Sequence, residues 1–581
     1  MSGVELHVNH RRGPVAPGTS LFDAARALGV FVPTSCVTQG KCKECLVEIA
    51  EGMEHLSPRT AAESHLREPF RLSCQARVLP EAAAAAGATR AVAAGGAEAA
   101  PRVVRCHTMR RGEMRIERHA LDLPVTLAAL PRDPCVTREG DRVLLDGKPI
   151  ARGGGPLLGV AADLGTTTVV LRLFDLERGE VVADTSFENP QRFGGSDVMS
   201  RIHFDTHHRG KLLQRTLAGY VGHAIEEFGA DPRSIYEMVV AGNSTMRDLF
   251  FRLDVYSIGQ NPYRSVTEVE ARDGRRAGTA VAATPARLRL PIHPRARVYG
   301  LPIVSGHVGA DAAACMLAVD IGREERLVAV MDIGTNTELI VGNRHRILAA
   351  SCPAGPAFEG GKILCGMPGL PGAIEEVRIQ GDGSVWTKTI GGGPAEGICG
   401  SGLVDALGEL LRTGRMNALG RLESGESEVR LDAGGERPVV LREADINELA
   451  QAKGANVAGL YIVMERYGIR FEDLDVFYLA GGFGRHVDVD SARRIGLIPN
   501  LADGRIRQVG NAAIEGASVA LLSRARRAEL EALVARVEHV RLETHPDFFH
   551  FFVEGCQFQP VETPARPPSP SSPPAGAATA P

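Results

Sequence analysis

Two stretches of the chain follow one design: LLGVAADLGTTT at residues 157–168 and LVAVMDIGTNTE at residues 327–338. Each begins with an apolar run, as expected for a buried strand, and continues with Asp, Gly and hydroxyl or amide residues. Glycine lets the backbone approach a ligand, Thr hydroxyls and N–H groups donate to phosphate oxygens, and Asp holds a hydrated Mg²⁺. Two such turns predict a site that grips a polyphosphate from opposite sides.

A third stretch, YLAGGFGRHVD at residues 478–488, places glycines at a turn from a strand to a helix. Glycine there permits the close approach of a flat adenosine. The chain has no G-x-x-x-x-G-K-[ST] phosphate loop. Either aspartate of the two turns is a candidate to position Mg²⁺ and the attacking water. The candidate nucleotide residues are Asp163, Asp332, Gly165, Thr166, Thr167, Gly334, Thr335, Asn336, Gly481, Gly482 and Gly484.

The three motifs together resemble the ASKHA fold of acetate and sugar kinases, heat-shock chaperones and actin. The resemblance implies two ribonuclease-H-like lobes that close on ATP, and we expect them within residues 156–560. The alternative is that the motifs are tight turns of another α/β fold. Apolar strand runs alternate with helical stretches such as LVDALGELLRTG at residues 403–414, so either interpretation gives an α/β body.

Four of the eleven cysteines lie in the first 74 residues. Cys36, Cys42 and Cys45 are spaced C-x5-C-x2-C, and Cys74 follows in FRLSCQARV. Four thiolates suit tetrahedral iron or zinc. Structural zinc sites usually bring two ligand pairs, whereas three ligands plus one is close to the plant-type ferredoxin spacing. The pattern therefore favours an iron–sulfur cluster, with a zinc clip or four reduced buried cysteines as the alternatives.

The segments around these cysteines predict a strand at VELHVN, a helix at SLFDAARALG with Ser20 as its N-cap, and a strand at LVEIAEG. Residues 1–80 resemble the adrenodoxin and plant-type 2Fe–2S ferredoxins, which have a β-grasp fold. The resemblance implies that the four cysteines hold a 2Fe–2S cluster. One departure is that Val37 and Thr38 stand where those loops often carry glycine, so that only Gly40 remains.

Composition divides the rest of the chain. Residues 81–101 form an Ala/Gly-rich run that predicts a flexible linker, and the Pro-rich residues 561–581 predict a disordered tail. Residues 102–155 are expected to form a middle or linking domain. The formal net charge of −4 gives no basic excess for binding nucleic acid, and no apolar run is long enough for a membrane span. With no secretory signal visible, we expect a cytoplasmic protein.

A ferredoxin fused to an ASKHA ATPase resembles the reductive activators of corrinoid enzymes. Further strings of that family include ENPQRFGGSDVMSRI (188–202), AGNSTMRDLFF (241–251), CPAGPAFEGGKI (352–363) and GNAAIEGA (510–517). The resemblance implies that the chain uses ATP to pass one electron from its cluster to cob(II), giving cob(I). Implied cofactors are the 2Fe–2S cluster, ATP and Mg²⁺. Implied partners are a corrinoid protein or cobalamin-dependent methyltransferase, an upstream low-potential electron donor and, in a homodimer, a second copy of the chain.

Two rival functions use the same motifs: an ATP-driven electron donor to another low-potential enzyme, and a nucleotide-switched chaperone-like protein whose cluster senses redox state. Asp205, His207 and Gly210 match the cobalamin-ligand string D-x-H-x-x-G, but the segment before them is mixed and predicts a surface helix. A second cluster, held by Cys315, Cys352, Cys365 and Cys399, is disfavoured because none of them has close ligand spacing.

Overall fold

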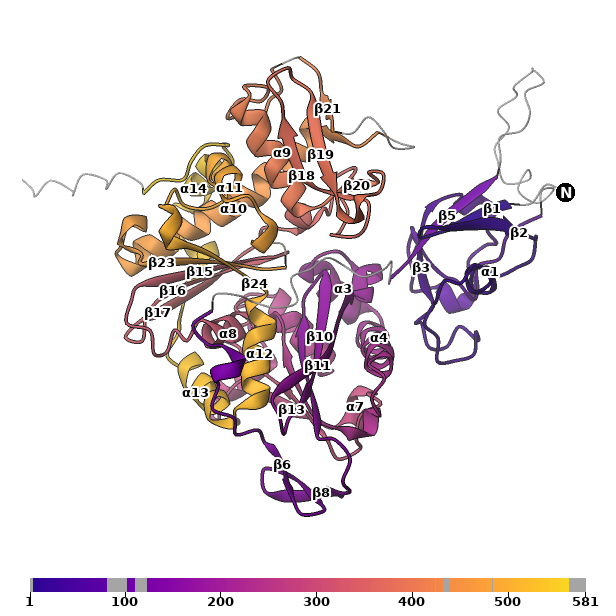
Figure 1. Ribbon diagram of the computed structural model, residues 1–581, viewed down its shortest axis with the longest axis vertical. Helices are drawn as coiled ribbons and strands as arrows, with labels where there is room; N and C mark the ends of the chain where they lie inside the picture. Colours follow the sequence, from indigo (N-terminus) through magenta and orange to yellow (C-terminus); the bar gives the residue numbers. More distant parts are fainter. Residues whose placement is uncertain are drawn as a thin grey trace, which may run out of the picture.

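The computed structural model describes residues 4–80, 102–109, 123–423, 425–431, 438–482 and 484–563 (Figure 1). The expected linker at 81–101 lies outside the described residues, as does the expected tail from residue 564 onward. Val561, at the start of that predicted tail, is buried and forms a β-bridge with Pro499.

The N-terminal domain is a five-stranded sheet in the order β2-β1-β5-β3-β4, with one α-helix among its described residues. Strands β1 and β2 form a hairpin, and the predicted cap Ser20 accepts a hydrogen bond of 3.1 Å from the N–H of Asp23. The α/β composition and the β-grasp arrangement agree with the predicted fold. Its elements are β1 (Val4–Val8), β2 (Arg11–Val15), α1 (Leu21–Ala27), β3 (Leu46–Glu51), β4 (Phe70–Leu72) and β5 (Val103–Thr108).

The central strand of this sheet comes from beyond residue 80, the expected end of the N-terminal domain. Strand β5 runs parallel to β1 and antiparallel to β3, so the sheet needs residues 103–108. The expected middle domain at 102–155 therefore gives its first strand to the N-terminal domain. The remainder contains a three-stranded antiparallel sheet of β6 (Val136–Glu139), β7 (Arg142–Leu145) and β8 (Lys148–Arg152).

The first lobe is built on a six-stranded sheet in the order β11-β10-β9-β12-β14-β13. Its strands are β9 (Leu158–Leu164), β10 (Thr168–Asp175), β11 (Glu180–Glu188), β12 (Ile235–Ala241), β13 (Val281–Ala283) and β14 (Arg297–Gly300). Its helices are α3 (Val198–His207), α4 (Leu212–Glu227), α5 (Ser244–Phe250), α6 (Val266–Arg272), α7 (Pro285–Leu288) and α8 (Ala310–Ala318).

The second lobe repeats this plan with the sheet order β24-β23-β15-β16-β17-β25. Its main strands are β15 (Val328–Ile333), β16 (Thr337–Gly342), β17 (Ile347–Cys352), β23 (Val476–Ala480), β24 (Ile506–Gly510) and β25 (Glu538–His539). Two small sheets are inserted: β18 (Ala373–Ile379), β19 (Val385–Thr389) and β20 (Gly397–Ile398), and β21 (Glu428–Arg430) with β22 (Val440–Arg442). Its helices are α9 (Gly400–Arg412), α10 (Glu443–Tyr467), α11 (Val489–Ile495), α12 (Ala512–Leu522), α13 (Arg524–Val534) and α14 (Phe548–Gly555).

In both lobes three consecutive antiparallel strands are followed in the sheet by two parallel strands, β12 and β14 in the first lobe and β23 and β24 in the second. This repetition confirms the predicted pair of ribonuclease-H-like lobes. Helices α8 and α12 pack against each other between the sheets, in a core that includes residues of both lobes. A Cβ at Gly516 would lie 1.9 Å from the carbonyl oxygen of Ala314, so this crossing requires glycine.

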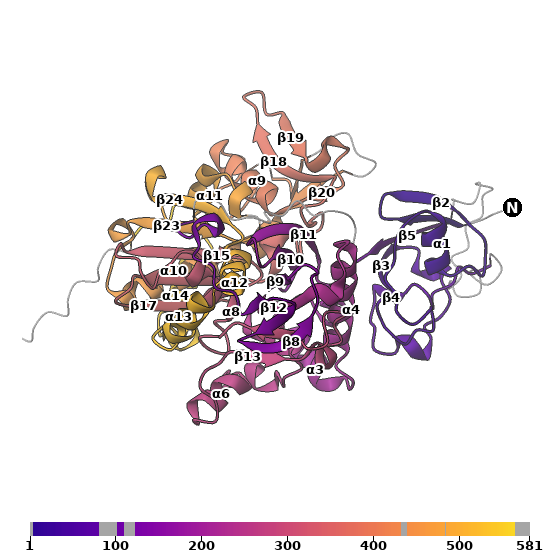
Figure 2. The same ribbon diagram turned by 60° about the horizontal axis from the view of Figure 1, so that its bottom comes forward.

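The N-terminal domain lies beside the first lobe, against helix α4 (Figure 2). No helix among the described residues combines the length and apolar character that crossing a membrane requires.

Candidate functional site

The two predicted phosphate turns face each other across a pocket between the lobes. The pocket has a volume of about 1170 Å³, including its open mouth. It contains the β9–β10 turn of the first lobe and the β15–β16 turn of the second. Among the sequence-predicted residues, it is lined by Asp163, Gly165, Thr166, Thr167, Asp332, Gly334, Thr335, Asn336, Gly481 and Gly482.

The first turn is fixed by close backbone contacts and by two asparagines. A Cβ at Gly165 would lie 2.6 Å from the carbonyl oxygen of Thr168, so the turn requires glycine. The amide of Asn243 donates to the hydroxyl of Thr166 over 2.9 Å, and the amide of Asn511 donates to the carboxylate of Asp163 over 2.9 Å.

These asparagines were not predicted, although both lie in strings quoted from the sequence. Asn243 follows strand β12 and caps α5, whereas Asn511 follows strand β24 and caps α12. A strand, a glycine and an asparagine at the start of a helix occur once in each lobe, and this repetition is the signal that could have found them. Other lining residues missed from the sequence include Asp311, Glu338, Glu359 and Ser401.

The two lobes meet at their threonine hydroxyls. Thr167 Oγ1 of the first turn lies 3.0 Å from Thr335 Oγ1 of the second. Glu359, from the 3₁₀ turn Pro356–Glu359 of the second lobe, accepts a hydrogen bond of 2.8 Å from Thr167 and another from Thr335 through the same carboxylate oxygen. The hydroxyls predicted to bind phosphate are thus joined across the cleft by one carboxylate.

The pocket is strongly acidic, and no lysine or arginine is among the described residues that line it. Burial raises the pKa of Asp163 to about 6 and that of Asp311 to about 7, and the charge of Asp332 adds to both shifts. Burial also raises the pKa of Asp332 itself. The lining carboxylates are Asp163, Asp311, Asp332, Glu338, Glu359 and Glu375. Binding of a polyphosphate here requires a cation to offset the combined negative charge.

The glycine turn of the second lobe fits the prediction only in part. Gly481 has a φ of 110°, and a Cβ there would lie 2.3 Å from the carbonyl oxygen of Ile333, so glycine lets this turn approach the end of β15. Gly484 does not line the pocket. Its N–H donates to the carbonyl of Gly481 and its carbonyl accepts from the side chain of Gln508, so both of its backbone groups are used within the turn.

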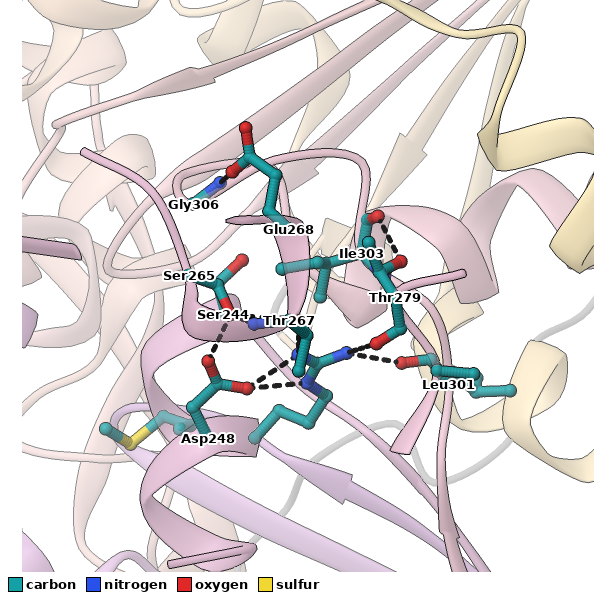
Figure 3. A network of polar contacts seen from close by, with 12 residues as sticks. Ser244, Asp248, Ser265, Thr267, Glu268, Thr279, Leu301, Ile303 and Gly306 are labelled. Carbon is teal, nitrogen blue, oxygen red and sulfur yellow. Dashed lines mark hydrogen bonds and ion pairs between the residues drawn. The ribbon is translucent and has the colours of Figure 1, made fainter. Parts of the chain in front are cut away.

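Helix α5, which Asn243 caps, takes part in a buried polar network (Figure 3). Arg247, fully buried in α5, donates to the Asp248 carboxylate, to the Thr267 hydroxyl and to the carbonyls of Thr279 and Leu301. Because a buried charge is costly unless it is paired, this network holds helix α5 against the segments next to strands β13 and β14.

The four predicted cluster ligands lie together in the N-terminal domain as two pairs. Cys45 Sγ lies 3.2 Å from Cys74 Sγ, and the Cys36 thiol interacts with Cys42. The hydrogen bond between them lowers the pKa of Cys74 to about 6 and raises the pKa of Cys45, so the two thiols titrate as a pair. In the described part of the chain, no three Cys, His, Asp or Glu side chains surround one point as a mononuclear metal site would require. A zinc ion needs its four ligands around a single point, whereas two thiol pairs separated in space fit the two irons of a cluster.

The loop between Cys36 and Cys42 has a left-handed backbone at three residues, of which only one is glycine. Val37 and Thr38 have φ values of 51° and 62°, and Gly40 has 69°. This conformation is unfavourable for β-branched residues. The N–H of Lys41 donates to Cys36 Sγ over 3.3 Å, so the loop supplies a backbone donor to a ligand sulfur despite its lack of glycines.

The next part of the cysteine segment, between Cys42 and Cys45, packs against helix α4 of the first lobe. Tyr220 donates its hydroxyl to the carbonyl of Glu44 over 2.9 Å, and the His223 ring lies 3.2 Å from the Glu44 carboxylate. A Cβ at Gly219 would lie 2.8 Å from Glu44 Cγ, so glycine leaves room for this side chain. The cysteine loop therefore lies against the lobe that carries the first phosphate turn.

Two other groups of residues were disfavoured as sites from the sequence. The carboxylate of Asp205 lies 2.6 Å from the ammonium of Lys211, and His207 is exposed on helix α3. Cys315 lies 3.3 Å from the Asp332 carboxylate, and Cys399 lines the pocket between the lobes. Within the described ranges, no metal-binding group includes Cys315, Cys352, Cys365 or Cys399.

Comparison with known proteins gives matches along most of the chain. A 2Fe–2S iron–sulfur cluster binding domain matches residues 7–79, the RACo middle region matches 158–324, and the C-terminal ASKHA domain of RACo matches 326–567. The chain is similar to the corrinoid activation enzyme RamQ of Eubacterium limosum, with 28% identity over 94% of this chain and 97% of that one. It is also similar to a [Co(II) methylated amine-specific corrinoid protein] reductase of Methanosarcina barkeri, with 26% identity over 70% of this chain and 79% of the other.

Among solved structures, a reductive activator for corrinoid, iron–sulfur protein superposes with a TM-score of 0.68 and 25% identity, covering 96% of this chain and 98% of that one. The two RACo regions together span more than two thirds of the chain. These matches follow the order of the N-terminal domain and the two lobes. The chain therefore belongs to the RACo family of reductive corrinoid activators.

Proposed function

We propose that this chain is an ATP-dependent reductive activator that passes one electron to the Co(II) of a corrinoid protein and so produces Co(I). The observation that carries the proposal is that the four thiols lie in a domain that packs against the lobe carrying the first of the two predicted phosphate turns. The curated relatives, named for corrinoid activation and for reduction of a Co(II) corrinoid protein, support this choice over another low-potential acceptor.

The nucleotide part of the proposal assigns the phosphates to the two facing turns. Gly165, Thr166, Thr167, Gly334, Thr335 and Asn336 would donate to phosphate oxygens, and Gly481 and Gly482 would lie against the adenosine. Asp163 and Asp332 would position Mg²⁺ and orient water. Mg²⁺ usually keeps several waters and binds through one or two carboxylates plus phosphates. An acidic pocket without a three-ligand group among its described residues suits such a site.

The electron-transfer part assigns the metal to Cys36, Cys42, Cys45 and Cys74. When bound there, a 2Fe–2S cluster supplies a one-electron carrier, which a low-potential donor reduces and which the partner's Co(II) oxidises as it becomes Co(I). The residues around the thiols hold the loop and donate hydrogen bonds to sulfur, from Lys41 to Cys36 and from Gln75 to Cys74 over 3.3 Å each. Such donors stabilise the negative charge on the thiolates.

Anaerobic absorbance spectroscopy tests the proposal. The purified chain is mixed with a Co(II) corrinoid protein of a methyltransferase system and a low-potential reductant, and Co(I) absorbance is followed with and without ATP. We expect a Co(I) signal that requires both ATP and intact Cys42. Cys42→Ser should abolish the signal, whereas Cys106→Ala, which removes a buried thiol from the same sheet, should retain it.

The rival functions give different results. If several corrinoid proteins yield no Co(I) although the chain binds ATP and its cluster is reducible, another electron acceptor is favoured. If ATP turnover and release of a protein partner are unchanged in Cys42→Ser, the nucleotide-switched chaperone is favoured.

A further inference from the structure

The segment 188–202, which has no role in the proposed function, runs from the nucleotide pocket to the N-terminal domain. At its inner end, Asn189 holds the first phosphate turn: its N–H donates to the carbonyl of Thr167 over 2.7 Å, and its side chain donates to the carbonyl of Gly165 over 2.8 Å. Asn189 is fully buried, so these contacts are sheltered from water.

At its outer end the same segment contacts the N-terminal domain. The guanidinium of Arg192 lies 3.4 Å from the carboxylate of Glu48 in strand β3. The ring of Phe193 packs edge-on against His65, with 6.0 Å between the ring centroids. Only two residues separate Asn189 from Arg192, so a shift of the phosphate turn moves the docking contacts with it.

Near its C-terminal end the segment carries Arg201, a buried arginine close to the junction of the lobes. Arg201 is fully buried and donates to the carbonyl of Gly195, to Gln191 and to Met246, whereas its Nη2 has no hydrogen-bond partner among the described residues. Arg201 also interacts electrostatically with Glu359. An unpaired N–H of a buried guanidinium is costly, and a carboxylate is its natural acceptor.

Glu359 has two competing sets of partners. In the structure its carboxylate accepts from Thr167 and Thr335, which are the hydroxyls assigned to the phosphates. Phosphate oxygens and this carboxylate are acceptors for the same donors, and their negative charges repel. A nucleotide whose phosphates accept hydrogen bonds from these hydroxyls would displace the Glu359 carboxylate. Arg201 is a buried cation with which that carboxylate could then pair.

We propose, building on the ATP binding proposed above, that nucleotide moves Glu359 from the two threonines to Arg201 and that the segment 188–202 passes this change on, weakening the docking of the N-terminal domain on the first lobe. The docked arrangement is the one in which Glu359 occupies the threonines, so the nucleotide favours the undocked one. Coupling between two sites is reciprocal. Variants that weaken docking must therefore bind nucleotide more tightly.

Two variants weaken docking without touching the pocket. Glu48→Ala removes the ion pair to Arg192, and Gly219→Ala places a methyl group against Glu44. Their matched controls are Glu270→Ala, from a half-buried ion pair of the same lobe, and Gly222→Ala, on the same helix with only an ordinary contact to Pro291.

The test measures the Kd of a non-hydrolysable ATP analogue with Mg²⁺ by calorimetry on the full chain. Glu48→Ala and Gly219→Ala should each bind the analogue about fivefold or more tightly than wild type, and both controls should stay within about twofold. Unchanged or weaker binding by both docking variants would overturn the coupling. If wild type does not bind the analogue, the proposed ATP function itself is wrong. If wild type binds it but neither docking variant binds it more tightly, only the coupling is wrong.

A double-mutant cycle then tests the role of Glu359. Glu359→Gln keeps the shape of the side chain but removes the charge that Arg201 would attract. Adding Gly219→Ala to this variant should change the Kd by less than about twofold. A full fivefold effect in the Glu359→Gln background would show that the coupling does not pass through Glu359. Amide exchange of residues 41–51, measured with and without the analogue, reports docking independently: it should rise with the analogue in wild type and stay constant in Glu359→Gln.

Discussion

Thr167 Oγ1 lies 3.0 Å from Thr335 Oγ1, although the two residues are 168 positions apart in the chain. The two residues occupy equivalent turns of two lobes with the same strand order. Their contact therefore places the junction of the lobes at the position assigned to the phosphates. Any ligand bound between these hydroxyls must change how the lobes meet, which is the property that an ATP-driven activator requires.

Removing one of these hydroxyls should weaken nucleotide binding. Thr335→Val deletes a donor to phosphate, and a hydrogen bond to a charged group contributes about 1.5–3 kcal/mol, so we expect the Kd of the ATP analogue to rise about tenfold or more. Thr413→Val, which loses a hydroxyl bonded to the carbonyl of Glu409 at the end of α9, is the control and should keep the wild-type Kd. Equal affinities for the two variants would argue against phosphate binding at Thr335.

The turns could be predicted from the sequence because each one is local. In both lobes the pattern is contiguous: a buried strand is followed by an aspartate, a glycine and threonines. The expected roles of Asp163 and Asp332 follow from this short pattern alone. The cysteine pattern is equally local for Cys36, Cys42 and Cys45.

The residues that were missed depend on contacts between distant segments. Asn243 and Asn511 reach the first turn only because strands β12 and β24 bring them there, one from each lobe. Strand β5 pairs with β1 across about a hundred residues, so the sequence near residue 103 does not indicate which sheet this strand joins. Gly484 does not line the pocket, because a glycine can close a turn as readily as line a pocket, and the sequence does not distinguish the two roles.

Arg247 should be essential for stability, because it is buried with an ionised partner. In Arg247→Met, Asp248 loses the guanidinium that pairs with it, and breaking a buried ion pair costs about 3–5 kcal/mol. Urea denaturation should show this loss in the free energy of unfolding. Arg276→Met, which breaks the half-buried pair with Glu270, should lose less than about 1 kcal/mol. A similar small loss for Arg247→Met would mean that its network does not hold helix α5.

Lys453 should make stability depend on pH. It is fully buried and donates to the carbonyls of Gly555 and Gln557 at the end of α14, and burial lowers its pKa to about 7. Between pH 7 and the ordinary pKa of lysine, the unfolded chain binds more protons than the folded one, so the free energy of unfolding rises with pH. We expect a rise of about 2 kcal/mol from pH 7 to pH 9.

The control for this effect is Lys453→Met, which should flatten the rise while lowering stability overall. Denaturant titrations at both pH values compare the two proteins. An equal rise in Lys453→Met would assign the pH dependence to other groups.

The close crossing of α8 and α12 should not tolerate a methyl group. Gly516→Ala would place its Cβ against the carbonyl of Ala314 and should lower the free energy of unfolding by about 1–3 kcal/mol. Gly504→Ala meets open space and should have little effect. Thermal denaturation of both variants measures the difference, and a Gly516→Ala protein as stable as wild type would mean that the helices can separate there without cost.

The central claim is that one chain couples nucleotide to the delivery of an electron, and a single-turnover experiment tests it most directly. The chain is reduced, freed of excess reductant under anaerobic conditions and mixed with a Co(II) corrinoid protein, and Co(I) absorbance is recorded before and after ATP is added. We expect little Co(I) before ATP is added and at most one Co(I) per chain afterwards, with an iron–sulfur absorbance change that shows matching oxidation of the cluster. Equal Co(I) formation without ATP, or an iron–sulfur spectrum that stays reduced while Co(I) appears, would contradict the central claim.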